Sequence, residues 1–222
     1  MKEHLFIFIL FICVIGCTRR PVVNKDLLVT KICNSFQDDN IIEPDSIKVI
    51  RIFKKHLDPY LQGVSQDSAE ALTTFVYYRL QRECLVFKDI SDRLGDGLKK
   101  SDWRGVDIEP ESEINEEGYN TFFKFKEFKY LEPNGDTSTV HITDSTWVDH
   151  FIDGTYSRLS LSKINQNEFV ITFIESNNRI RKNFSKPGER YRYKILKRDK
   201  NNYLMFVQAV GSQIKSLFKL YY

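Results

Sequence analysis

Residues 119–143 read YNTFFKFKEFKYLEPNGDTSTVHIT, and this stretch decides the fold class of the chain. Apolar and polar residues alternate on both sides of the PNGD segment at 133–136, which is typical of a tight turn between antiparallel strands. The first arm, 119–131, is predicted to be one strand, with a bulge near Lys126 where the alternation shifts phase. The second arm, 137–143, is predicted to pair with it as a hairpin.

The same alternation continues to the C-terminus. Short polar turns separate further strand-like segments at 155–162, 168–174, 190–197, 203–210 and 214–222, whereas residues 147–152 remain ambiguous. About seven strands joined by short turns indicate an antiparallel meander. A sheet of that length usually curls into a barrel or around a helix.

The preceding region has helical periodicity. About three helices are expected between residues 26 and 98: one over 26–36, one that begins near Ser46 and ends or kinks before Pro59, and a long one from Asp67 towards Gly95. Their apolar stripes consist of Val29, Cys33 and Phe36, then Ile47, Ile50, Phe53, Leu57 and Leu61, then Leu72, Val76, Leu80, Cys84 and Phe87. The fold class is therefore α+β: helices at 26–98, strands at 119–222 and a single domain over 26–222.

Composition narrows the function classes. The chain has 222 residues, of which 41% are hydrophobic and 28% charged, as in ordinary globular proteins. The formal net charge of +3 is too small to indicate a nucleic-acid partner. The sequence contains no G-x-S-x-G, H-E-x-x-H, P-loop, Rossmann or C-x-x-C motif, so it predicts no cofactor and no metal site.

The first residues, MKEHLFIFILFICVIGC, combine Lys2 with an apolar run of 11 residues at 5–15. This run is too short for a transmembrane helix and has the length of a secretory signal. Its end, Val14-Ile15-Gly16-Cys17, resembles the lipobox of bacterial lipoprotein precursors. The resemblance implies a signal peptide over 1–16, cleavage after Gly16, lipid attachment at Cys17 and a tether over 17–25, in a protein anchored in the bacterial envelope, on the periplasmic side of the outer membrane. It covers the leader alone.

Two of the four cysteines remain after Cys13 leaves with the leader and Cys17 takes the lipid. Cys33 and Cys84 both lie on apolar stripes, so a disulfide between the first and the long helix is geometrically possible, in a compartment where disulfides persist. The alternative is two buried free thiols that pack as small apolar residues.

Two polar clusters were considered as sites. His141, Asp144, Asp149, His150 and Asp153 fall within 13 residues, but their spacing fits no recurrent zinc pattern, and we interpret them as exposed strand and turn residues. In the second cluster, Arg190, Arg192 and Lys194 alternate with Tyr191, Tyr193 and Ile195, which predicts a basic outer and an aromatic inner face. The basic face is either a patch for anionic lipid headgroups or an envelope protein, or a solvated face that complements the acidic junction at 99–118.

These observations favour a non-catalytic binding or envelope-interaction module held at the membrane by its lipid. A lipocalin-like carrier with a cavity in the sheet is the alternative, because barrels of about eight strands either fill with side chains or hold a small ligand. A hydrolase is the third hypothesis, without a local motif to support it. The oligomeric state is left open by the sequence.

Overall fold

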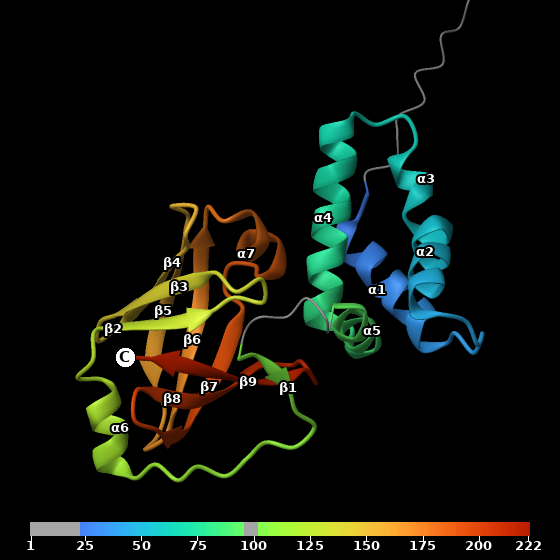
Figure 1. The fold of residues 1–222 in the computed structure, drawn as a ribbon. Helices are drawn as coiled ribbons and strands as arrows, with labels where there is room; N and C mark the ends of the chain where they lie inside the picture. The colour runs from blue at the N-terminus through green and yellow to red at the C-terminus, as the bar shows by residue number, and fades with distance from the viewer. Residues whose placement is uncertain (1–22, 96–101) are drawn as a thin grey trace, which may run out of the picture.

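The computed structural model describes residues 23–95 and 102–222 and arranges them as a helical part beside a β-barrel (Figure 1). The helical part consists of α1 (Lys25–Gln37), α2 (Asp45–His56), α3 (Asp58–Leu61), α4 (Gln66–Glu83) and α5 (Leu85–Gly95). The second part contains β1 (Arg104–Gly105), α6 (Glu116–Phe122), β2 (Glu127–Leu131), β3 (Thr137–Ile142), β4 (Thr146–His150), β5 (Tyr156–Lys163), β6 (Glu168–Ser176), α7 (Arg179–Phe184), β7 (Arg190–Arg198), β8 (Asn202–Ala209) and β9 (Lys215–Tyr221). The leader, Cys17 and most of the tether lie outside the described residues.

The sheet closes on itself. Strands β2 to β8 pair antiparallel in chain order, and β9 pairs with β8 along its length and with β2 through Lys129 and Tyr221. This ring forms an eight-stranded antiparallel barrel, and the short β1 pairs with Ser216 and Leu217 of β9, before the point where β2 meets that strand. The predicted α+β class with a barrel-like sheet is confirmed. Closure leaves no long unpaired edge within the ring.

Aromatic side chains fill the barrel. Trp147 lies 5.9 Å from Phe169, and Phe169 stacks on Tyr193 at 5.2 Å between ring centroids. Trp147 and Phe169 belong to one hydrophobic cluster of 20 buried residues, and the half-buried Tyr193 packs against it. The interior of this barrel is therefore occupied by its own side chains, which is the usual state of an eight-stranded barrel.

Helix α6 closes one end of the barrel (Figure 1) and corrects the predicted strand at 119–131, of which only Glu127–Leu131 is β2. Asn115 begins the helix, because its side chain accepts a hydrogen bond from the Gly118 amide. Phe122 is fully buried and stacks on Phe128 at 4.8 Å. The aromatic run fits helical spacing as well as strand alternation, and packing against the barrel decides between them.

The helical part has its own core and one disulfide. Cys33 of α1 and Cys84 are bonded, with a Cα–Cα distance of 5.6 Å, as one of the two hypotheses predicted. The predicted long helix is wrong in one respect, because it breaks at Cys84, which has extended dihedrals (φ −117°, ψ 99°) between α4 and α5. This break turns α5 away from the axis of α4 (Figure 1).

The predicted apolar stripe over 47–61 is confirmed in its second half, where Leu57 is buried and Phe53 and Leu61 pack against the helical core. It is wrong in its first half, because Ile52 and His56 are the buried residues of α2, whereas Ile47 and Ile50 are 50% and 54% exposed. Ser35 of α1 and His56 Nε2 are hydrogen-bonded at 2.8 Å, which satisfies the buried imidazole. The predicted stop before Pro59 is confirmed, since α2 ends at His56 and Pro59 lies in the first turn of α3.

Ion pairs join the two parts where α4 packs beside α7. Arg79 of α4 is 2% exposed and donates to the Phe184 carbonyl at 2.8 Å and to the Glu189 carboxylate at 2.9 Å. Arg82 Nε lies 3.1 Å from the same carboxylate. Buried charges are tolerated when they are paired in this way. No helix in the described part of the chain is long and apolar enough to cross a bilayer.

Candidate functional site

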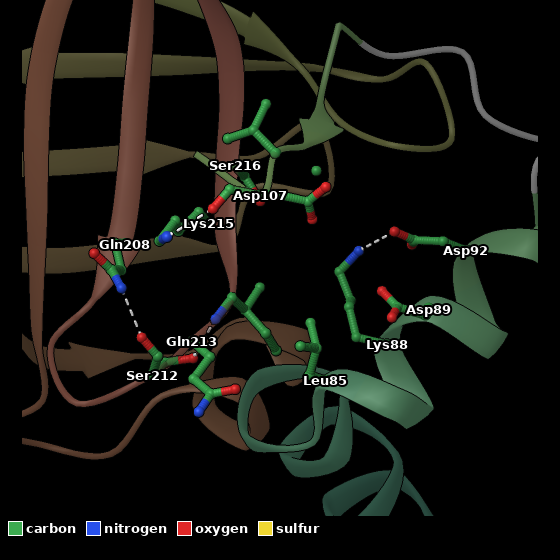
Figure 2. Close-up of a pocket in the computed structure, with 13 residues that line it drawn as sticks. Leu85, Lys88, Asp89, Asp92, Asp107, Gln208, Ser212, Gln213, Lys215 and Ser216 are labelled. Carbon is green, nitrogen blue, oxygen red and sulfur yellow. Dashed lines mark hydrogen bonds and ion pairs between the residues drawn. The ribbon is translucent and has the colours of Figure 1, made fainter. Parts of the chain in front are cut away.

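A groove of about 620 Å³ lies between α5 and the barrel, in the seam between the two parts (Figure 2). Its α5 wall carries Leu85, Lys88 and Asp89, and its barrel wall is formed by the segment after β1 and by the turn between β8 and β9. A second hollow of about 410 Å³ shares Leu85 and Gln213 with it and continues towards Gln37 of α1. The two hollows share part of their lining, and we call them together the seam groove.

The seam groove is polar with an apolar strip. Lys88 pairs with Asp92 along α5, and Lys215 Nζ donates to the Asp107 carbonyl at 2.8 Å. The turn residues form a further wall, where Gln208 Nε2 donates to the Ser212 carbonyl at 2.7 Å. Leu85 remains 39% exposed beside these groups. Charges of both signs, amides and a few aliphatic side chains suit an extended peptide-like partner better than a purely apolar ligand.

The basic strand β7 is placed as predicted but is not a free basic surface. Tyr191 and Ile195 belong to the barrel cluster and Tyr193 packs against it, which confirms the predicted inner face. On the outer face, Glu109 pairs with Arg192 and lies 3.0 Å from Lys194 Nζ, so that Lys194 is only 8% exposed.

Hydrogen bonds from Arg192, followed by those from Lys194, lower the pKa of Glu109 to about 2. Arg190 is the exposed member of the three. The acidic junction therefore neutralises this strand, as the solvated-face interpretation anticipated in part, and the proposed anionic-partner patch lacks two of its three free cations.

The histidine–aspartate cluster does not assemble into a metal site. His141 Nε2 lies 3.2 Å from Glu127, and its ring contacts that of His150 at 5.1 Å on the outside of the barrel. Asp144 and Asp153 are exposed in turns. Within residues 23–95 and 102–222, no group of three or more His, Cys, Asp or Glu side chains is arranged to hold a metal ion.

Asp149 is the exception in that cluster, and the interpretation of it as an exposed residue is wrong. It follows Trp147 by two positions on β4, so both side chains point into the barrel, and Asp149 is 8% exposed. The Trp147 indole donates to Asp149 Oδ1 at 3.0 Å. Burial raises the pKa of Asp149 to about 6, and the nearby Arg181 guanidinium offsets part of that rise.

Arg181 of α7 lies over this end of the barrel, which we call the α7 end. It pairs with Glu132 at 2.5 Å, donates to the Tyr130 hydroxyl at 3.3 Å and lies 5.2 Å from the centroid of the Phe151 ring. Sequence analysis missed Arg181, Glu132 and Tyr130 because they belong to separate elements. The available signal was the two-residue spacing of Trp147 and Asp149, which places a carboxylate on an aromatic inner face.

No family model matches this chain, and searches of curated proteins and of solved structures gave no significant match.

Proposed function

We propose that the protein is a lipid-anchored, non-catalytic binding module of the bacterial envelope, and that its partner occupies the seam groove. The observation that carries the binding role is the contrast between a filled barrel and an open recess. The cluster inside the barrel includes fully buried rings such as Phe169 and Tyr203, whereas the seam groove exposes Leu85, Lys88 and Gln213. Ligand sites occur preferentially at the junctions between such parts.

Because the barrel is filled and the seam groove is open, the lipocalin-like carrier is the second hypothesis. A barrel is compatible with a lipocalin-like binder. In this structure, however, the apolar interior is filled by side chains, whereas a carrier needs an empty cavity for its ligand. Displacing several buried rings would cost several kcal/mol, since removing one buried Phe costs roughly 3–5 kcal/mol. A recess that is already open requires no such rearrangement.

The anchor part of the proposal rests on Cys17 and the lipobox-like residues before it. Two or three acyl chains hold a protein at a bilayer where one gives marginal binding, at about 0.8 kcal/mol per buried methylene. Attachment at Cys17 leaves about five residues before the described chain at Val23, a reach of roughly 17 to 20 Å. We propose the periplasmic side of the outer membrane as the location, with an envelope protein as the partner.

Fatty-acid labelling tests the anchor. Cys17→Ala is expected to abolish incorporation of a labelled fatty acid and to leave an unprocessed precursor, whereas Cys13→Ala leaves labelling intact. Equal labelling of the wild type and Cys17→Ala would refute lipidation at this residue.

Site-specific photo-crosslinking tests the groove. A photoreactive residue at Gln213, in the groove, is expected to give one discrete crosslinked species in intact cells, and Leu85→Glu on the facing wall is expected to reduce its yield. Ile164, which is 53% exposed and lies in the turn between β5 and β6, is the matched control position. The same species from both positions, or an unchanged yield with Leu85→Glu, would contradict a role for the groove.

A further inference from the structure

A second feature, separate from the anchor and from the seam groove, is the buried carboxylate at the α7 end of the barrel. Within the described part of the chain, Asp149 forms no ion pair, and its carboxyl is hydrogen-bonded by the Trp147 indole at 3.0 Å and by the Tyr130 hydroxyl. Buried carboxylates are normally paired with a cation, because an uncompensated charge in a low-dielectric interior is costly. The Arg181 guanidinium lies nearby but is directed to Glu132.

The walls around Asp149 combine acid and aromatic groups. Trp147 and Tyr193 lie 5.4 Å apart between ring centroids, and the Phe151 ring faces the Arg181 guanidinium. Tyr130 adds a buried hydroxyl, and Glu132 adds a second carboxylate, which accepts from Ser138 Oγ at 2.8 Å. Two carboxylates beside aromatic faces are the chemistry that recognises an organic cation, such as an amine or a guanidinium group.

Helix α7 covers this end and is attached mainly by polar contacts at its surface, such as the pair of Arg179 with Glu70 of α4, while the Phe184 ring packs against the barrel cluster. It has six residues, none of them buried, and Ile180 is 45% exposed. Its start is held by Asn178, whose side chain accepts from the Ile180 and Arg181 amides and donates to Thr155 Oγ1. Its end is held through the Phe184 carbonyl, which accepts from Arg79. An element with few buried apolar contacts is the kind that opens locally at low free-energy cost.

We propose that the α7 end of the barrel is a binding site for an organic cation of the alkylguanidinium or alkylammonium class, covered by α7 as a lid whose Arg181 occupies the site when no ligand is bound. An incoming cation replaces the guanidinium of Arg181 at Glu132 and gains the unpaired carboxylate of Asp149. Arg181 then moves outward with α7. Because a cation of the chain already fills the closed state, an external ligand competes with it and binds more weakly than to the open state.

The experiment uses full-length protein in detergent, with ethylguanidinium as the probe and the neutral N-ethylurea as the matched compound. The readout is the indole N–H resonance of Trp147, assigned with Trp147→Phe. In the wild type, ethylguanidinium is expected to shift this resonance saturably, while N-ethylurea leaves it in place. Hydrogen exchange at the Lys182 and Ser185 amides, which bond within the α7 turn, is expected to accelerate with the cation alone.

Arg181→Ala removes the competing cation and is expected to lower the dissociation constant for ethylguanidinium about tenfold or more. Arg179→Ala is the control, since Arg179 lies on the same helix but pairs with Glu70 on the surface, and it is expected to bind like the wild type. Asp149→Asn is expected to weaken binding in either background, because the amide removes the carboxylate that the cation gains.

Equal shifts with the cation and N-ethylurea would overturn the proposal, and so would cation binding that Asp149→Asn leaves unchanged. A response confined to Arg181→Ala would also overturn it, since Arg181 would then be a fixed part of the wall. The wild-type titration decides the matter even if Arg181→Ala does not fold.

Discussion

The helical part and the barrel reach stability by different routes. The helical part has a core cluster of 13 buried hydrophobic residues, mostly aliphatic, and ties α1 to the break between α4 and α5 with the Cys33–Cys84 disulfide. The barrel has a larger cluster of 20 buried hydrophobic residues, rich in aromatic rings, and closes its own sheet. A helical unit of this size buries a small hydrophobic core, so a disulfide adds stability that packing alone does not supply. In the closed barrel, each strand is paired with its neighbours around the ring, and the larger core supplies the stability.

The largest effect is expected from breaking the barrel's packing. Phe122 is fully buried and contacts Phe128, Phe169 and Tyr203 from α6. Phe122→Ala is expected to lower the free energy of unfolding by about 3–5 kcal/mol, because it leaves a cavity that the surrounding rings cannot close. Denaturant titration measures the loss, and Ile164→Ala, at an exposed turn, should change it by less than about 0.5 kcal/mol. A loss as small for Phe122→Ala would mean that α6 does not pack in the barrel.

Removing the disulfide tests the helical part on its own. The enclosed loop of 51 residue steps corresponds to about 4 kcal/mol in the chain-entropy model. Cys33→Ala with Cys84→Ala is expected to expose the α1 and α4 amides to hydrogen exchange well before those of β5 and β6. An equal loss of protection from hydrogen exchange in both parts would show that the two parts unfold as one unit. The proposed difference in how they are stabilised would then be wrong.

The buried acid gives the barrel a pH dependence. The folded pKa of Asp149, about 6, lies above its ordinary value of 3.8, so the folded state holds a proton that the unfolded chain releases between these values. Stability is therefore expected to fall as pH rises from about 4 to about 6, by up to about 3 kcal/mol. Asp149→Asn should flatten melting temperature against pH in this window. An unchanged slope would mean that the carboxylate is solvated.

A smaller effect of opposite sign is expected at the outer face of β7. The pKa of Glu109 is lowered from 4.5 to about 2, so its contribution is present above pH 4.5 and is lost as pH falls towards 2. Glu109→Gln is expected to cost about 1 kcal/mol near neutral pH, because Arg192 and Lys194 lose a charged acceptor. Glu111→Gln, an exposed neighbour, is the control for melts at pH 7 and pH 3. Equal behaviour of the two variants would show that Glu109 is not paired in solution.

Much of the fold follows from local patterns. The turns at 133–136 and 200–202, the alternation on β7 and the stop before Pro59 are confirmed because each depends on neighbours in the chain. Segments with two acceptable periods were predicted wrongly. Residues 119–125 suit a strand or a helix, and the stripe predicted for α2 began with Ile47 and Ile50, which are exposed, whereas its later members pack in the core.

The candidate sites also depend on contacts between residues that are distant in the sequence. The sequence located Asp149 but gave it the wrong surroundings, and for Arg192 and Lys194 it left a free basic patch and a face neutralised by the acidic junction as alternatives. Glu109 reaches Lys194 from 85 residues away, and Arg181 reaches Glu132 from 49 residues away. Neither contact can be predicted from a short stretch of sequence. The same is true of the seam groove, which is lined by α5 and by the turn between β8 and β9.

The sequence by itself determined the fold class, the inner face of β7, the possibility of the Cys33–Cys84 bond and, as an expectation that labelling will test, the anchor at Cys17. The tertiary structure alone decided that the barrel closes and fills, that α6 and α7 cover its ends, and that Asp149 is buried beside a cation it does not bond. The physical reason is range. Periodicity and turn chemistry act between neighbouring residues, whereas burial and charge pairing depend on which distant segments meet.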